Sequence, residues 1–327
     1  MKYSLATVGD MGLDDYVRVV PQIYGAHDEN RSIWDVWCHT LHHGAAIAER
    51  IRKKVTPEKL FTEIADFSLW LFTFVHKLSH PIGRRANPNE TSIETIIRVR
   101  NLCSNIVWYR YPGVCHLCYA RRKAARAPKA EVVAACDCSP RLNDLRNKET
   151  TRADSKALRE FGTANEKRQP KTIDDWQALF GQIFRDRLRS LSLPEIGFHL
   201  LEELGEVSDA LVRMYSYREK DFRRGEPNWR QVRLEAQIAD VFSWLFAVVE
   251  KLNESKADKE ILGRIWLSGI IWQRYGADDL ESFRCPSCNK AVCGCRLVFV
   301  PATRPVRDLL RNLQPSRARA RARARTR

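Results

Sequence analysis

The sequence of 327 residues lacks the long apolar segments that cross membranes. Its longest apolar runs, Phe67 to Val75 and Val241 to Val249, fall well short of the roughly 20 residues that span a bilayer. No apolar signal segment follows Met1. We therefore expect a cytoplasmic protein with no membrane partner.

Strand patterns are also scarce. Apolar and polar residues rarely alternate along the chain, whereas apolar residues recur at helical spacing in several segments. With 327 residues, of which 44% are hydrophobic, the chain is long enough for two ordinary domains with buried cores. The sequence therefore predicts an all-α fold built from helical bundles.

Three segments in the first half of the chain match segments in the second half. The matched pairs are residues 13–51 with 173–211, 63–78 with 237–252, and 106–111 with 270–275. The first pair aligns without a gap at a shift of 160 residues, and an insertion in the second copy raises the shift to 174 for the next pair. We therefore expect two copies of one helical unit.

This repeat divides the chain into four regions. Residues 1–138 and 172–300 each form a helical unit that ends in a cysteine-rich loop, and residues 139–171 are a highly charged linker. Residues 301–327 hold nine arginines and one aspartate, so they carry +8 of the net charge of +15. This arginine-rich tail has no apolar periodicity, which predicts disorder. We expect it either to bind nucleic-acid phosphates nonspecifically or only to increase solubility.

Eight of the ten cysteines form two clusters. The clusters are Cys115, Cys118, Cys136 and Cys138, and Cys285, Cys288, Cys293 and Cys295. Each combines a Cys-x-x-Cys pair with a Cys-x-Cys pair, and four thiolates form the closed tetrahedral set of a structural zinc site; we expect about two Zn²⁺ ions per chain. Disulfides are rare inside cells, and redox-active thiols need a thioredoxin-like context that is missing. Cys38 and Cys103 lie in apolar helical patterns, which predicts that they are buried.

Acidic residues stand at unusual places in two helical segments of the second copy. Glu202, Glu203 and Glu206 crowd into one helical turn, although like charges at this spacing repel each other. Within residues 237–249, Asp240 is the only ionised residue in an otherwise apolar helix, and a buried carboxylate needs a pairing cation or a metal ion. A plain solvated face explains the glutamates alone. Together with Asp240, the acids predict a Mg²⁺ site between two packed helices.

The order of these motifs resembles that of the MazG-like, all-α nucleoside triphosphate pyrophosphohydrolases. The resemblance rests on Glu-Glu-x-x-Glu at residues 202–206, on the aspartate of IADVFSWLFAVV in the next helix, and on the ending WxRY, CPxC and CxC, which is similar to a subgroup with an added cysteine cluster. It covers both copies. It implies two tandem helical bundle units that form an intrachain pseudo-dimer. Because such proteins are commonly dimers or higher oligomers, a homo-oligomer is also an expectation.

The activity that the resemblance implies is Mg²⁺-dependent hydrolysis of a nucleoside triphosphate to the monophosphate and pyrophosphate. It assigns Mg²⁺ binding to Glu203, Glu206 and Asp240. It also implies an auxiliary role for Glu202 and makes Gln237 a weak ligand or a spacer. Bound Mg²⁺ would neutralise the triphosphate and activate the attacking water.

Each copy departs from the family's pattern. Gln237 stands where the family has glutamate, and His43 and Ala46 stand where the second copy has Glu203 and Glu206. We therefore expect the second copy to be catalytic and the first to be mainly structural.

The first copy retains Glu63 and Asp66, which leaves alternatives open. These two acids complete the site of the second copy if the copies exchange helices. They also combine with His39 and His43 in a degenerate transition-metal site, because imidazole and carboxylate together suit such ions. A function of a different class also fits, namely a degenerate, non-catalytic double unit that senses nucleotides or binds nucleic acid.

Overall fold

The structure is a computed structural model. It describes residues 8–28, 31–79, 102–119, 152–216, 229–254, 264–277 and 282–295. The chain divides into one compact unit, Met1–Cys293, and a second, Gly294–Arg327, of which only Gly294 and Cys295 are described. The elements below belong to the first unit.

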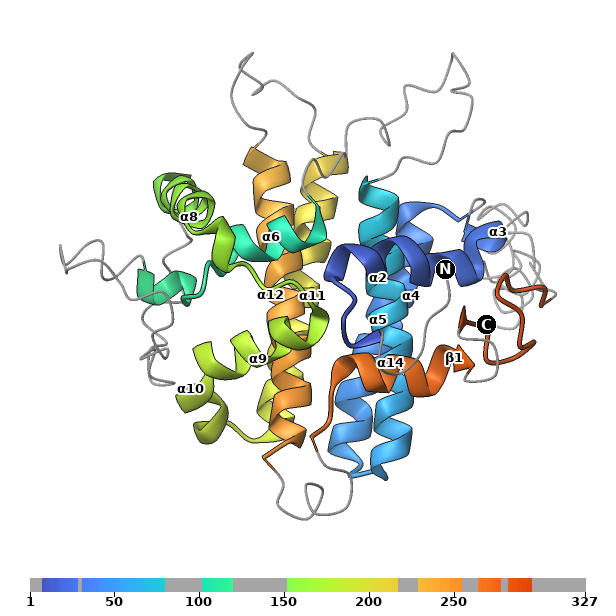
Figure 1. Ribbon diagram of the computed structural model, residues 1–327. Helices are drawn as coiled ribbons and strands as arrows, with labels where there is room; N and C mark the ends of the chain where they lie inside the picture. Colours follow the sequence, from blue (N-terminus) through green and yellow to red (C-terminus); the bar gives the residue numbers. More distant parts are fainter. Residues whose placement is uncertain are drawn as a thin grey trace, which may run out of the picture. The chain divides into compact units, whose positions relative to one another are not determined.

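Helices form most of the described secondary structure (Figure 1). In the first half these are α2 (Leu13–Val19), the 3-10 helix η1 (Val20–Tyr24), α3 (Gly25–Asp28), α4 (Ile33–Arg52), α5 (Pro57–Ser79) and α6 (Cys103–Arg110). In the second half they are α9 (Ile173–Ile183), α10 (Arg185–Ser190), α11 (Leu193–Ser216), α12 (Trp229–Leu252) and α14 (Leu267–Tyr275). Two short strands, β1 (Gly276–Ala277) and β2 (Ser282–Phe283), pair antiparallel. The predicted all-α fold class is confirmed.

The segment predicted as a charged linker also contains helix. α8 (Arg152–Ala164) and the 3-10 helix η4 (Glu166–Arg168) lie within residues 139–171. α8 packs against α6, where the indole of Trp108 donates a hydrogen bond of 2.8 Å to the carbonyl oxygen of Gly162. Part of the linker is therefore packed against the helices that it connects.

Two long helices, α5 and α12, form the centre of the core. Every residue from Phe67 to Val75 and from Val241 to Val249 is buried, as expected for helices that are apolar all round. The longest apolar runs of the sequence are thus used in packing. Within the described ranges, none of the helices combines the length and the apolar content that crossing a membrane demands.

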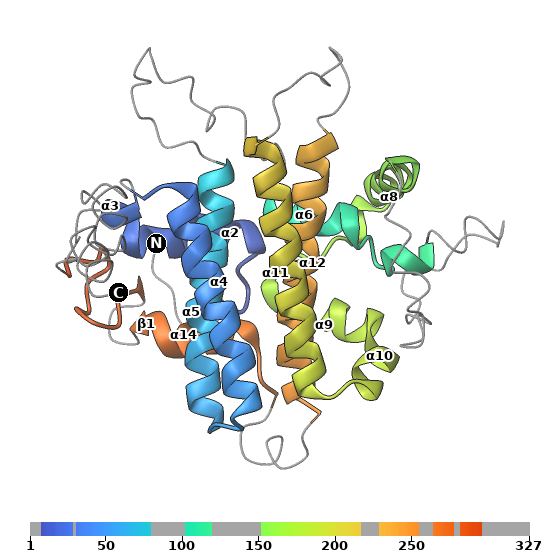
Figure 2. The same cartoon turned by 180° about the vertical axis from the view of Figure 1, so that it is seen from behind.

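Each central helix pairs with a second long helix. α4 packs along α5, and α11 packs along α12 (Figures 1 and 2). α4 and α11 in turn contact each other in antiparallel orientation. The Trp37 indole near the start of α4 donates a 2.9 Å hydrogen bond to the hydroxyl of Ser208 towards the end of α11. At the other end, Ile51 of α4 lies beside Gly197 of α11.

The two short helices pack on the opposite half. α6, from the first half, packs against α12, whereas α14, from the second half, packs against α5. Asp14 in the first turn of α2 accepts hydrogen bonds from the backbone N–H and the hydroxyl of Ser104 in α6. Asp174 in the first turn of α9 accepts a 3.0 Å hydrogen bond from the hydroxyl of Ser268 in α14. Each short helix therefore contacts a first-turn aspartate of its own half and packs against the central helix of the other half.

A glycine permits the close approach of α4 and α11. A Cβ atom at Gly44 would lie 2.3 Å from Leu204 Cδ1 and 3.2 Å from the Phe67 ring. Leu204 is fully buried, so its side chain has little room to move. Gly44 and Leu204 are also equivalent positions at the shift of 160 residues.

We expect Gly44→Ala to destabilise the protein by about 1 to 3 kcal/mol, the usual cost of overpacking a filled core. The matched control is Gly205→Ala in α11, where a Cβ atom would meet nothing within 4 Å. That control should stabilise the protein by about 0.5 to 1 kcal/mol through helix propensity. Urea unfolding measures both changes, and equal effects of the two substitutions would contradict the close approach.

Asp174 makes the stability of the α9–α14 contact depend on pH. Burial raises the pKa of Asp174 from 3.8 to about 6, against the opposing effect of the Ser268 hydrogen bond. Its Oδ1 atom is buried with no hydrogen-bond partner within the described ranges. A carboxyl whose pKa is higher in the folded state stabilises the fold when protonated. This contribution is complete below about pH 4 and is lost as the pH rises through about 6.

Asp174→Asn, which mimics the protonated carboxyl, should therefore be more stable than the wild-type protein near neutral pH but not near pH 4. The full rise of the pKa corresponds to about 3 kcal/mol. Solvent screening of this partly exposed group reduces the expected difference to about 1 to 2 kcal/mol. Urea unfolding across this pH range checks the result. A difference that stays constant with pH would show that Asp174 is ionised in the folded protein at all these values.

Candidate functional site

Two neighbouring helices carry the acids that the sequence predicts as ligands. α11 presents Glu203 and Glu206 about one turn apart, and α12 presents Asp240. Glu203 is partly buried, and its Oε1 atom accepts a 3.2 Å hydrogen bond from the Trp244 indole. Glu206 is exposed, whereas Asp240 is only 4% exposed. The acids therefore extend from the surface into the core.

Asp240 is bound by an arginine and a tyrosine from the other half of the chain. Arg110 Nε donates to Oδ1 at 2.9 Å, and Arg110 Nη2 donates to Oδ2 at 2.7 Å. The Tyr111 hydroxyl donates to Oδ1 at 2.7 Å. The Arg110 and Asp240 side chains are only 11% and 6% exposed. A buried ion pair thus holds the C-terminal end of α6 on α12.

The charges in this cluster change the protonation of its members. Burial alone would raise the pKa of Asp240, but the Arg110 guanidinium lowers it below its usual value. Burial raises the pKa of Glu203 well above its usual range, and the charges of Asp240 and Glu206 raise it further. Desolvation and the Asp240 charge also raise the pKa of Glu206. Burial and Arg110 lower the pKa of His116 to about 3, so this imidazole is neutral.

Gln237 lies about one turn before Asp240 on α12. Its Oε1 atom is buried and has no hydrogen-bond partner among the described residues. Buried polar atoms of this kind are uncommon in folded proteins, and a role in binding is one explanation for them. The amide oxygen of Gln237 is therefore available as a ligand.

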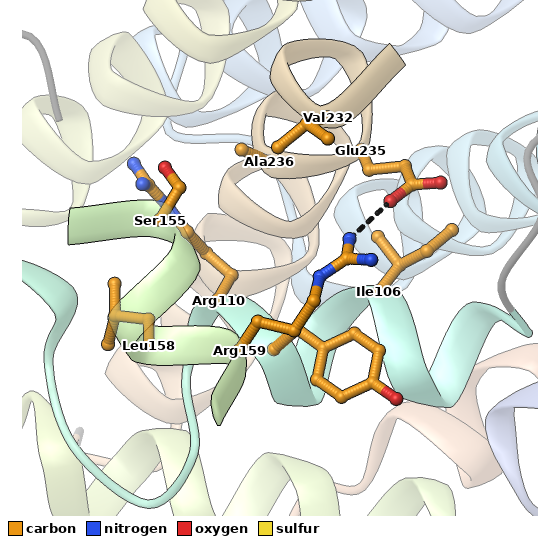
Figure 3. A pocket seen from close by; sticks show the side chains of 9 residues that line it. Ile106, Arg110, Ser155, Leu158, Arg159, Val232, Glu235 and Ala236 are labelled. Carbon is orange, nitrogen blue, oxygen red and sulfur yellow. Dashed lines mark hydrogen bonds and ion pairs between the residues drawn. The ribbon is translucent and has the colours of Figure 1, made fainter. Parts of the chain in front are cut away.

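Glu235 lies two residues before Gln237 on α12, but its side chain contacts α8. Its Oε2 atom accepts a 3.1 Å hydrogen bond from Arg159 of α8, beside a cavity of about 30 Å³ between α6, α8 and α12 (Figure 3). Arg110 also lines this cavity, but its side chain runs in another direction from that of Arg159 (Figure 3). A cavity of this volume accommodates a water molecule and is far too small for a nucleotide.

Glu202 is exposed beside the acids. Its Oε2 atom lies 3.1 Å from His199 Nδ1, and the His199 ring stacks on Trp244 with ring centres 4.4 Å apart. Trp244 in turn donates to Glu203. Glu202 is therefore linked to Glu203 through two rings.

The first half repeats the arginine and tyrosine arrangement. Asp66 of α5 accepts a 3.0 Å hydrogen bond from Arg274 Nε and another from the hydroxyl of Tyr275. Asp66 corresponds to Asp240, and the Arg274–Tyr275 pair corresponds to Arg110–Tyr111. The same contact is therefore made twice, each time between the two halves.

The other acid of the first half is held separately. His43 Nδ1 lies 3.2 Å from Glu63 Oε2, and Arg50 Nη2 donates to Glu63 Oε1 at 3.1 Å. His39 instead stacks on Trp70, with ring centres 4.3 Å apart. Of the residues predicted for a degenerate site, the structure brings His43 and Glu63 into direct contact and pairs Asp66 with α14.

Four thiols come together after β2. Ligand atoms of Cys285, Cys288, Cys293 and Cys295 all lie within 4.8 Å of one another. The Cys288 and Cys293 sulfurs are 4.0 Å apart, close to the separation of about 3.8 Å that tetrahedral Zn–S bonds of 2.3 Å require. Burial alone would raise the pKa of Cys285, but N–H groups of Cys288 and Ser287 lower it below its usual value. This cluster can hold a metal ion, and zinc is compatible with it.

The loop backbone also shapes this cluster. Asn289 has a positive φ of 54°, a left-handed conformation that asparagine tolerates. Its N–H donates to the carbonyl of Cys285 at 2.8 Å, and the Cys293 N–H donates to the carbonyl of Ile23 at 2.6 Å. The loop of the second half thus contacts η1 of the first half.

The other cysteines are described only in part. Cys115 and Cys118 are buried, while Cys136 and Cys138 of the same predicted zinc site lie outside the described residues. Cys103 is buried as predicted. The prediction that Cys38 is buried is wrong, because this residue lies on the exposed face of α4.

Among the residues that the structure describes, the second cysteine cluster is the group of ligands that meets closely enough for a metal ion. The oxygen atoms of Glu203, Glu206 and Asp240 do not meet in this way, and Asp240 is bound by Arg110 and Tyr111 instead. The Mg²⁺ site therefore stays a prediction.

The arginine and tyrosine residues of this arrangement belong to the repeat and to the WxRY motif, but the sequence alone assigned them no role. Arg110 and Tyr111 end the segment IVWYRY, and Arg274 and Tyr275 end IIWQRY. The signal was present, because both copies keep the Arg-Tyr pair and both keep an aspartate in the most apolar helix. A carboxylate in an apolar helix requires a cation beside it, and these arginines supply one to each aspartate.

Comparisons with known proteins add no relative. No family model, curated protein or solved structure matches the chain. The resemblance to the MazG-like pyrophosphohydrolases therefore rests on the motifs alone, and function has to be argued from the site.

Purified without chelator, the protein should contain about two zinc ions per chain, and Cys285→Ser should lose about one of them. The metal supplies much of the folding energy of such a loop, so the variant should also be cut faster by trypsin at Lys290. Elemental analysis and timed proteolysis measure both effects. Cys38→Ser, at an exposed position outside the clusters, should keep the full zinc content. Unchanged zinc in Cys285→Ser would exclude this thiol as a ligand.

Proposed function

We propose that the chain is a Mg²⁺-dependent nucleoside triphosphate pyrophosphohydrolase whose second half is catalytic. The observation that carries this proposal is the charge of the second-half acids. Asp240 pairs with the guanidinium of Arg110, and the charge of this guanidinium also acts on Glu203 and Glu206. When all three carboxylates are ionised, they carry two more charges than Arg110 balances, because Arg233, which also acts on Glu206, is paired with Asp209. A divalent cation balances this excess.

The first half supports the proposal by contrast. There Asp66 pairs with Arg274, and Glu63 pairs with Arg50, so two carboxylates meet two guanidinium groups. Ala210 stands in the second half where Arg50 stands in the first. The two halves pack in a similar way. Among the groups named here, only those of the second half carry more negative than positive charge.

The donor atoms of the second half suit Mg²⁺. Carboxylate oxygens and an unpartnered amide oxygen are the hard ligands that this ion prefers. Glu203, Glu206 and Asp240 would hold it, with Gln237 as a weak ligand. When bound, the ion supplies charge neutralisation for the triphosphate and activation of a water.

The reaction breaks one phosphoanhydride bond. Water attacks the α-phosphorus, the bond to the oxygen that bridges the α- and β-phosphates breaks, and pyrophosphate leaves with that oxygen. Glu202 keeps an auxiliary role: through His199 and Trp244 it orients Glu203. The proton that the water releases passes to the solvent.

We also propose that the halves are tandem MazG-like units paired as an intrachain pseudo-dimer. Two contacts between equivalent positions support this: Gly44 meets Leu204, and each short helix binds the aspartate of the other half. A further homo-oligomer, a cytoplasmic location and nonspecific nucleic-acid binding by the arginine-rich tail stay predictions. The tail lies outside the described residues.

A non-catalytic function is the second candidate, and one observation favours it. Both oxygens of Asp240 accept hydrogen bonds from Arg110. If this pair persists when nucleotide binds, the second half senses the nucleotide without hydrolysing it. Hydrolysis assays separate the two candidates.

Glu206→Gln tests the proposed enzyme. The substitution removes a charge from an exposed position, so the fold should be kept. We expect kcat to fall at least about 100-fold, equivalent to about 2.7 kcal/mol of transition-state stabilisation. The measurement is Mg²⁺-dependent pyrophosphate release from a panel of nucleoside triphosphates.

Glu63→Gln in the first half is the matched control. It should leave the rate unchanged, because Glu63 is paired with Arg50 and belongs to the half without Glu203 and Glu206. Loss of activity in a folded Glu63→Gln protein would instead support a site composed from both halves. No pyrophosphate release by the wild-type protein from any triphosphate would favour the sensing function.

A further inference from the structure

The Arg110 guanidinium occupies the place beside Asp240 that a metal ion needs. Two hydrogen bonds from Arg110 and one from Tyr111 fill three positions on the two carboxylate oxygens. A carboxylate has about four such lone-pair positions. A divalent cation would also stand close to the guanidinium in a buried site, where like charges repel strongly.

A second observation fits a cation ligand at this place. The Gln237 Oε1 atom, on the same side of α12 as Asp240, is buried without a partner among the described residues. Arg110 has hydrogen-bonded Asp240 but leaves this oxygen unsatisfied. The site therefore contains an oxygen ligand, Gln237 Oε1, that Arg110 does not bind.

A small cavity borders Arg110. Its side chain lines the cavity of about 30 Å³ between α6, α8 and α12 (Figure 3). This volume is about that of one water molecule, so it loosens the packing beside Arg110 but does not accommodate the guanidinium itself.

We infer that Arg110 controls the access of metal to this site. It holds Asp240 when no ligand is present, and it transfers to a substrate phosphate when a triphosphate binds. A planar guanidinium binds carboxylate and phosphate with the same pair of parallel N–H donors, so the two bonds to Asp240 are replaced by two bonds to phosphate. The identity of this ligand rests on the proposed function. The first half thus contributes a positioning residue to the site of the second half.

The chain itself offers a matched control. Arg274 binds Asp66 as Arg110 binds Asp240, but His43 and Ala46 stand where Glu203 and Glu206 would be needed. Removing Arg274 therefore frees a carboxylate without creating a set of oxygen ligands.

The test is binding of Mn²⁺ alone, measured by electron paramagnetic resonance on zinc-loaded full-length protein. Arg110→Met should bind Mn²⁺ at least about tenfold more tightly than the wild-type protein, because a repelling charge is removed. Arg274→Met should bind it as the wild-type protein does. Adding Asp240→Asn to Arg110→Met should abolish the gain. Circular dichroism confirms that each variant is folded.

An Arg110→Met protein that is folded but binds Mn²⁺ no more tightly than the wild type overturns the inference, as does an equal gain in Arg274→Met. If Arg110→Met does not fold, Arg110→Lys replaces it, since lysine keeps the charge but cannot donate to both oxygens in parallel. This variant should show a smaller gain, and no gain overturns the inference. If Arg110→Met binds Mn²⁺ more tightly but the wild type hydrolyses no triphosphate, the role of Arg110 is supported and the enzyme is rejected. If the wild type hydrolyses a triphosphate but Arg110→Met binds Mn²⁺ no more tightly, the enzyme is supported and the role of Arg110 is rejected.

Discussion

Asp66 and Asp240 lie in the two most buried helices, where a carboxylate is stable as an anion only beside a positive charge. Arg274 and Arg110 supply that charge, each from the other half of the chain. Removing one member of a buried pair such as Arg110–Asp240 typically costs about 3 to 5 kcal/mol, and less is expected for Arg274–Asp66, where the arginine side chain is 35% exposed. The positions of α6 and α14 follow from this requirement. So does the interdependence of the halves, because neither aspartate is neutralised within its own half.

Much of the fold could be predicted from the sequence, because the physical signals were local. The apolar residues of α5 and α12 follow helical spacing without a polar face, and Asp14 and Asp174 are typical of a first helical turn. The exchange of α6 and α14 could not be predicted in this way. A repeat places equivalent segments in both halves, and it does not say which half each segment packs against. Gly44 likewise reads as an ordinary helix residue until its neighbour across the interface is known.

The same distinction between local signals and distant contacts applies to the candidate site. Spacing within one helix placed Glu203 beside Glu206 and Gln237 beside Asp240, since side chains three residues apart share a face. Contacts between distant segments decide how the acids are charged, and Arg110 is 130 residues away from Asp240. Cys38 shows that a local signal can also fail. Its apolar neighbours in the sequence predicted burial, but the residue lies on the exposed face of α4.

A comparison of the two halves also separates the effect of helix packing from the effect of the charged groups. Both place a histidine ring on a tryptophan, His39 on Trp70 and His199 on Trp244, with ring centres 4.3 Å and 4.4 Å apart. Both pair the central aspartate with arginine and tyrosine. The raised pKa of Glu203 comes from burial beside other carboxylates, a combination that the first half avoids with His43. Packing cannot account for such acids, because the equivalent helix packs as well without them. Their cost to stability is a reason to look for a ligand that offsets it.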